Sequence, residues 1–110
     1  MNDDMNAEDI FQNLKEVANS DDAVHMRAYM KNQFEFLGVK TPVRRQVSKI
    51  FFKKNHKSTI DWKFIHQAWD NPYREMQYVV LDYLQLKQKA LTPSDLPKIK
   101  KLAQTKPWGD

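Results

Sequence analysis

The sequence has only two glycines, no cysteine and no long hydrophobic run. Because Gly38 and Gly109 are too few for a glycine-rich phosphate cradle or a dinucleotide fingerprint, nucleotide chemistry of those types is excluded. The lack of cysteine excludes disulfides, thiol nucleophiles and thiolate metal sites, and suits a reducing cytoplasm. The acidic N-terminal segment does not resemble a secretory signal, and no stretch of about 18 apolar residues could span a membrane.

What is present is enough for one small folded domain, expected to cover residues 1–110 with a disordered tail at 1–6. The chain has 110 residues, of which 41% are hydrophobic and 12% aromatic. Charge is unevenly distributed. Residues 1–22 have one basic residue against seven acids, whereas residues 23–57 have nine against one. Such a basic segment attracts phosphate polyanions, although it can also be a solvated helix face.

Apolar residues recur with helical spacing and predict six short helices. We expect them at residues 7–19, from 20 or 21 to about 36, from 41, at 61–71, from 72 to about 89, and from 95. Asn6, and Ser20 or Asp21, are expected caps, and Pro42 suits a first helical position. The expected apolar or buried stripes are Ile10, Leu14 and Val17; Val43, Val47, Ile50 and Phe51; and Met76, Val80, Tyr83 and Leu84. In the second helix, Met26, Tyr29, Met30 and Gln33 are expected to share a face.

No segment alternates with period two for long enough to predict a strand, so the fold class is all-α. The connections are short, which predicts antiparallel neighbouring helices. Periodicity alone leaves open a closed bundle and a solenoid of HEAT-like helix pairs. No two of the three histidines have metal-ligand spacing, so no metal site is expected.

The segment from residue 38 to 57 holds the main candidate binding residues. Cations are unfavourable at a helix N-terminus, so two adjacent arginines there favour an anion or phosphate site over a merely solvated first turn. Lysines continue the positive surface along the same helix. The predicted DNA contacts are Lys40, Thr41, Arg44, Arg45, Lys49 and Lys53.

Other notable residues have structural interpretations. The phenol of Tyr29 is expected to complete the core, with a groove as the alternative. Trp69 is expected to pack between helices, and Arg74 and Glu75 to form a charged pair that ties adjacent units together.

Three segments in this order resemble the AlkD-like DNA alkylation repair family, whose members are DNA glycosylases built from HEAT-like repeats. The first is Tyr-Met-Lys-Asn-Gln-Phe-Glu-Phe-Leu-Gly-Val-Lys-Thr-Pro-Val-Arg-Arg at residues 29–45. The second runs from Trp69 through Tyr83 and includes Pro-Tyr-Arg-Glu-Met-Gln-Tyr at residues 72–78 and Leu-Asp-Tyr-Leu, which ends at residue 84. The third comprises Leu-Thr-Pro-Ser-Asp-Leu-Pro and Thr-Lys-Pro-Trp. The resemblance implies antiparallel helix pairs stacked as an α-α superhelix.

The resemblance also implies an activity. Family members excise cationic N3- or N7-alkylated purines from duplex DNA by hydrolysing the N-glycosidic bond, with no metal and no cofactor. A basic concave face holds the duplex, so the implied partner is alkylated duplex DNA. The implied setting is a bacterial cytoplasm, in association with the nucleoid.

The family pattern places two adjacent tryptophans before an aspartate, and the catalytic aspartate shortly after. Here Trp108-Gly109-Asp110 puts Gly109 at the second aromatic position and the catalytic position beyond residue 110. Tyr29 matches a site-lining aromatic, and Trp108 and Asp110 adjoin the site. We therefore expect a truncated solenoid with poor activity and self-association through an exposed repeat face. The alternatives are a non-catalytic DNA-binding module and a protein-interaction scaffold.

Overall fold

Six α-helices and two 3-10 helices form the described part of the protein, which in this computed structural model comprises residues 5–54 and 59–105. The α-helices are α1 (Ala7–Glu16), α2 (Ser20–Tyr29), α3 (Thr41–Lys54), α4 (Trp62–Trp69), α5 (Arg74–Leu86) and α6 (Leu96–Thr105). The 3-10 helices are η1 (Gln88–Ala90) and η2 (Pro93–Asp95). Within these ranges the only β-type pairing is an isolated bridge between Glu35 and Tyr73. The all-α prediction is confirmed.

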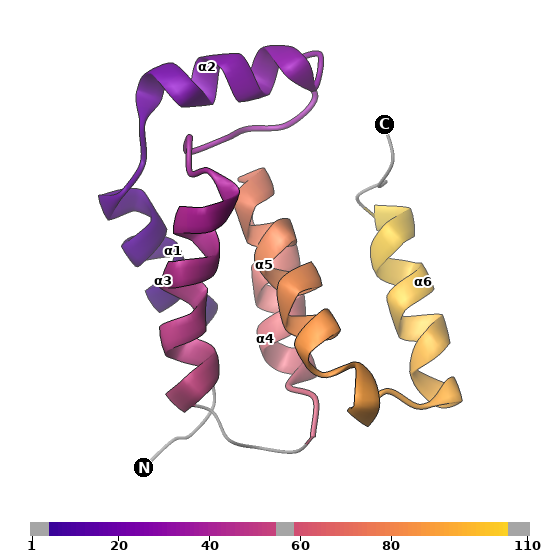
Figure 1. The fold of residues 1–110 in the computed structure, drawn as a ribbon. Coiled ribbons are helices and arrows are strands. Elements are labelled where there is room, and N and C mark those ends of the chain that lie inside the picture. The colour runs from indigo at the N-terminus through magenta and orange to yellow at the C-terminus, as the bar shows by residue number, and fades with distance from the viewer. Residues whose placement is uncertain (1–4, 55–58, 106–110) are drawn as a thin grey trace.

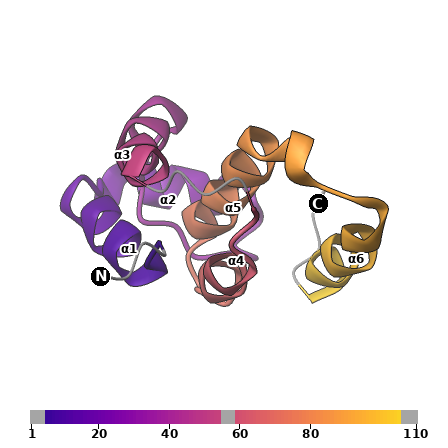
Figure 2. The ribbon, with the colours of Figure 1, turned by 90° about the horizontal axis from the view of Figure 1, so that it is seen from below.

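The helices form two layers, as in stacked helical repeats. Seen from below in Figure 2, α3 and α5 form one row, and α1, α4 and α6 form the other. From α3 to α6 the chain direction alternates, which confirms the predicted antiparallel neighbours for this part of the chain (Figure 1). Helix α2 differs, because it crosses over the ends of the other helices instead of running beside them. No helix among the described residues is long and apolar enough to cross a membrane.

Capping side chains begin several helices where the sequence predicts them. The side chain of Asn6 accepts a hydrogen bond from the backbone N–H of Glu8 at 2.8 Å, and Asp61 accepts one from Phe64 at 3.0 Å. The cap of α2 is Asn19, one residue before the predicted positions. Of the expected disordered tail, residues 1–4 lie outside the described residues, whereas Met5 is buried.

Helices α1 and α2 end earlier than predicted. Helix α1 stops at Glu16, and Val17, expected in its buried stripe, is 43% exposed. Helix α2 stops at Tyr29 because Lys31 and Asn32 adopt positive φ angles of 56° and 59°, which turn the chain back. The face predicted to continue to residue 36 therefore does not form.

The core lies between the two layers and centres on α4 and α5. Tyr83 is 1% exposed, and its ring lies 5.5 Å from that of Phe52 and 5.4 Å from that of Phe64. Its hydroxyl accepts a hydrogen bond from the backbone N–H of Asp61 at 2.9 Å. The buried stripe predicted for α5 is confirmed in full; it comprises Met76, Val80, Tyr83 and Leu84.

The predicted buried stripe of α3 is partly wrong. Val43 is 38% exposed and Ile50 is 56% exposed, whereas Arg44 and Ser48 on the same helix are buried. The helix is rotated relative to the prediction because Arg44 finds a carboxylate and an aromatic ring on α5 that offset the cost of burying its charge.

A buried carboxylate holds the segment that leads into α3. Glu75 is fully buried, and its oxygens accept hydrogen bonds from the backbone N–H groups of Leu37, Gly38 and Val39 at 3.0, 2.9 and 3.1 Å. The guanidinium of Arg74, also buried, lies 3.8 Å from the ring centroid of Phe34. Both members of the predicted charged pair thus fasten residues 34–39 to the start of α5.

Candidate nucleic-acid interface

A groove of about 810 Å³ runs between α3 and α5, on the side where the cations of α3 gather. Three cations line it against one carboxylate, so its walls are net positive. The groove also has a partly apolar floor. The lining residues are Arg45, Ser48, Lys49, Phe52, Lys53, Asp82, Gln85, Leu86 and Gln88.

Three of the predicted DNA contacts come together in this groove. Arg45, Lys49 and Lys53 lie four residues apart on α3, which is one helical turn, so their side chains lie on one side of the helix. A row of cations with this spacing can contact successive phosphates of a polyanion. The helix contributes no acidic residue of its own along its length.

Arg44 does not belong to this exposed row. It is 6% exposed, its Nε donates a hydrogen bond to Oδ2 of Asp82 at 3.1 Å, and its guanidinium lies 5.1 Å from the ring of Tyr78. Its Nη1 also donates to the hydroxyl of Thr41 at 3.4 Å. The prediction of a solvent-facing phosphate contact at this residue therefore needs correction, because burial and the ion pair direct its charge into the protein.

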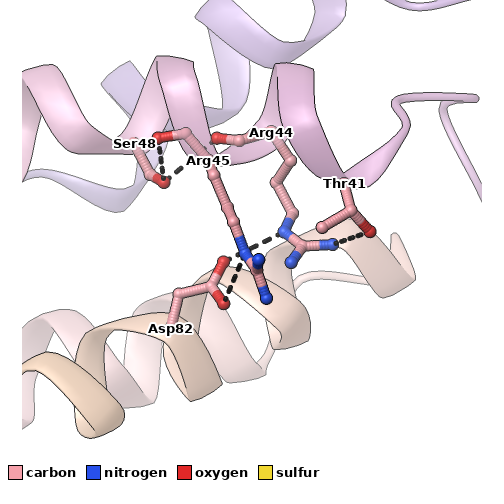
Figure 3. Close-up of polar contacts among 5 residues, drawn as sticks. All are labelled: Thr41, Arg44, Arg45, Ser48 and Asp82. Atoms are coloured by element: carbon pink, nitrogen blue, oxygen red, sulfur yellow. Dashed lines mark hydrogen bonds and ion pairs between the residues drawn. The ribbon is translucent and has the colours of Figure 1, made fainter.

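Asp82 joins the buried arginine to the groove. Figure 3 shows its carboxylate facing two arginine side chains that reach down from α3, with Oδ2 paired with Arg44 and Oδ1 with Arg45. Oδ1 lies 3.6 Å from Nε of Arg45, whose side chain is 63% exposed. The side chain of Asp82 is 16% exposed, so this carboxylate lies at the base of the groove rather than projecting from it.

Lys40 and Thr41 lie at the N-terminal end of α3 and do not line the groove. The side chain of Lys40 is 70% exposed, and its Nζ lies 3.9 Å from a carboxylate oxygen of Asp22. An ion pair this exposed contributes little to stability, so the ammonium group remains accessible to an anion. Lys40 extends the positive surface beyond the groove toward α2, and Thr41 adds a neutral hydroxyl beside it.

Tyr29 is 87% exposed, and the interpretation of its phenol as part of the core is wrong. It ends α2 beside a small hollow of about 280 Å³ with mostly apolar walls. The hollow is lined by His25, Met26, Tyr29, Met30, Phe36 and Tyr78. The other two residues predicted near a catalytic site, Trp108 and Asp110, lie outside the described residues.

The hollow and the groove are lined by residues one turn apart on α5. Tyr78 lines the hollow, packs near the ring of Phe36 at 6.4 Å, and lies beneath the guanidinium of Arg44. One turn along α5, Asp82 lines the groove. An aromatic surface is therefore adjacent to a basic one, with Arg44 between them.

Sequence reasoning missed both of these α5 residues. The signal was present, because Tyr78 and Asp82 are four residues apart and therefore lie on one face of α5. A single carboxylate at such a position indicates a basic partner on the neighbouring helix. Among residues 5–54 and 59–105 no group of three histidine, aspartate or glutamate side chains could hold a metal ion.

Comparison with known families agrees with the resemblance found in the sequence. Residues 10–110 match the family model described as DNA alkylation repair enzyme. The matched range includes every helix except the first residues of α1. A search of curated proteins finds no match to the chain.

Proposed function

The chain belongs to the DNA alkylation repair enzyme family, and from this premise we propose that it holds duplex DNA in the groove between α3 and α5. The proposed activity is that of a DNA glycosylase that removes cationic N3- or N7-alkylpurines. The observation that carries the proposal is the row formed by Arg45, Lys49 and Lys53 along one wall of the groove.

Electrostatics supports a duplex as the ligand. Each phosphate that a cation neutralises releases counterions, so a row of three cations gives affinity that depends strongly on salt and little on base sequence. Successive cations of the row are four residues apart, about 6 Å along the helix axis, so they can reach different phosphates of the duplex, which carries one phosphate per about 3.4 Å of axis on each strand. Lys40 is placed to contact the same backbone farther along, toward α2.

The hollow beside Tyr29 suits a positively charged base. Aromatic faces and methionine sulfur are polarisable, and a cation positioned over an aromatic ring is attracted by the ring quadrupole. An alkylated purine carries such a charge, whereas a normal purine does not. We propose that Tyr29 contacts the damaged nucleoside, and that Trp108 and Asp110 lie near the same site.

The reaction needs water as its only co-reactant. The bond between C1′ of the sugar and the purine nitrogen breaks, and its electron pair leaves on the purine, which becomes neutral. Water oxygen bonds to C1′ and loses one proton to the surroundings. Because the positive charge moves from the base to the sugar as the bond breaks, nearby anionic groups stabilise the transition state.

Anisotropy measurements on a labelled duplex test the binding proposal. Replacing Lys49 and Lys53 together by glutamine is expected to weaken binding similarly for all base sequences. The slope of log K against log salt should fall in magnitude by about 2, because each lost phosphate contact removes about 0.9. The control with the same net charge replaces Lys63 and Lys100 by glutamine, since both are exposed and neither lines the groove.

Excision is tested separately, by the release of 7-methylguanine from methylated duplex. Replacement of Tyr29 by alanine is expected to slow release more than it weakens binding to undamaged duplex. Salt-dependent binding with no release from the unaltered protein would favour a non-catalytic DNA-binding module. Failure to bind duplex even at low salt would contradict the proposal and favour a protein-interaction scaffold.

A further inference from the structure

We propose that Asp82 is a positioning residue that orients Arg45 for phosphate contact, an inference that rests on the proposed binding of duplex DNA in the groove. A carboxylate at the base of a groove that binds a polyanion is unexpected, because it repels the ligand. Its ion pairs with both arginines of α3 give it a different use (Figure 3).

The carboxylate is itself fixed from the protein interior. Oδ2 accepts a hydrogen bond from Nε of Arg44 at 3.1 Å, and the Arg44 side chain is 7% exposed. The Arg44 guanidinium is confined in turn by the ring of Tyr78 and by the hydroxyl of Thr41. The other carboxylate oxygen, Oδ1, is therefore held in one place, 3.6 Å from Nε of Arg45.

Contact at Nε has a consequence for the rest of the guanidinium of Arg45. The ion pair is made by one nitrogen, so the two terminal amino groups remain available to a ligand. A guanidinium binds phosphate best through two parallel N–H groups, and a side chain already oriented loses less conformational freedom when it binds. Lysine at the same position has a point charge and no planar fork.

For Asp82→Asn, this inference predicts a change in duplex affinity opposite to the change that simple electrostatics predicts. Removing a negative charge from a DNA groove normally strengthens binding to duplex. If Asp82 orients Arg45, then Asp82→Asn weakens binding even though the groove becomes more positive. In a protein that already carries Arg45→Lys, there is no fork to orient, so the same Asp82→Asn change should strengthen binding.

The experiment measures the Kd of a labelled duplex, at two salt concentrations, for the unaltered protein, Arg45→Lys, Asp82→Asn and the double variant. We expect Arg45→Lys to weaken binding by about 5–10-fold with net charge preserved, because the bidentate contact is lost. Lys63→Arg is the control, because Lys63 is exposed and does not line the groove, and this variant should bind duplex like the unaltered protein.

Loss of fold is checked by thermal melting of each variant. Arg45→Lys should melt with the unaltered protein because its side chain is largely exposed, whereas Asp82→Asn removes the partner of the buried Arg44. If Asp82→Asn does not fold, Asp82→Glu replaces it in the same comparison, because it keeps the negative charge beside Arg44 but moves the carboxylate. Asp82→Glu should weaken binding only where Arg45 is present, and unchanged binding in that background would overturn the positioning role. The positioning role is overturned if Arg45→Lys binds like the unaltered protein, or if Asp82→Asn strengthens binding in both backgrounds. If neither the unaltered protein nor any variant binds duplex, the positioning role and the proposed function are both wrong.

Discussion

Replacing Glu75 by glutamine should destabilise the protein strongly, because one buried carboxylate accepts hydrogen bonds from three consecutive backbone N–H groups. Glu75 has no exposed surface, and its contacts to Leu37, Gly38 and Val39 lie between 2.9 and 3.1 Å. Glutamine has nearly the same shape but only one acceptor oxygen and no charge. Its amide NH2 group would face donors instead of pairing with them.

The expected magnitude follows from the loss of charge at the accepting oxygen. Oε2 of Glu75 accepts from all three N–H groups, and Oε1 accepts from that of Leu37 as well. A hydrogen bond to a charged group contributes about 1.5–3 kcal/mol, against about 0.5–1.5 kcal/mol for a neutral one. A glutamine oxygen at the Oε2 position therefore weakens each of the three contacts by about 1–1.5 kcal/mol, which gives a destabilisation of about 3–5 kcal/mol. At about 4–8 °C per kcal/mol for a domain near this size, Tm should fall by at least about 12 °C.

Urea unfolding followed by far-UV circular dichroism gives the free energy of unfolding directly. The matched control is Glu16→Gln. Glu16 is exposed at the end of α1, so this substitution makes the same chemical change at the surface. It should alter stability by less than about 0.5 kcal/mol. A loss below about 1 kcal/mol for Glu75→Gln would refute the reasoning, since it would show that the three N–H groups do not depend on the carboxylate.

Three further predictions concern stability. Gly38→Ala should cost about 3 kcal/mol or more by urea unfolding, because Gly38 has a φ of +90° and an added Cβ would lie 1.8 Å from the backbone oxygen of Asn19. Trp69→Phe should cost about 1–2 kcal/mol and speed amide exchange in α6, because the indole N–H donates to the Leu102 carbonyl at 2.9 Å. Hydrogen bonding from the backbone of Thr92 lowers the pKa of Asp95 below its ordinary 3.8. The stability advantage of the unaltered protein over Asp95→Asn should therefore be full above that value and shrink as pH falls below it.

The helix boundaries that the sequence predicted correctly are those set by local chemistry. Asn6 and Asp61 cap helices because their side chains reach backbone N–H groups within three residues. The early end of α2 was not predictable in the same way. It depends on left-handed conformations at Lys31 and Asn32. Neither residue type adopts this conformation often enough for a single sequence to predict it.

The candidate site was harder to predict because its determinants are distant in sequence. Apolar periodicity placed Val43 and Ile50 inward on α3, but the orientation of the helix is set by Arg44, which pairs with Asp82 of α5. A partner so far along the chain leaves no periodic trace in α3 itself. Composition therefore located the basic helix correctly. Which of its cations are exposed depends on how α3 packs against α5, and this could not be predicted from the sequence of α3.

Residues of helix α5 hold several parts of the proposed site in position. Glu75, Tyr78 and Asp82 are spaced three and four residues apart, so they lie on one face of this helix. The first fixes the segment before α3, the second confines Arg44, and the third fixes the orientation of Arg45 at the groove. Because the cations of α3 are placed by residues that do not themselves need to contact DNA, substitutions along this face of α5 should alter duplex affinity through the position of α3 rather than through lost phosphate contacts.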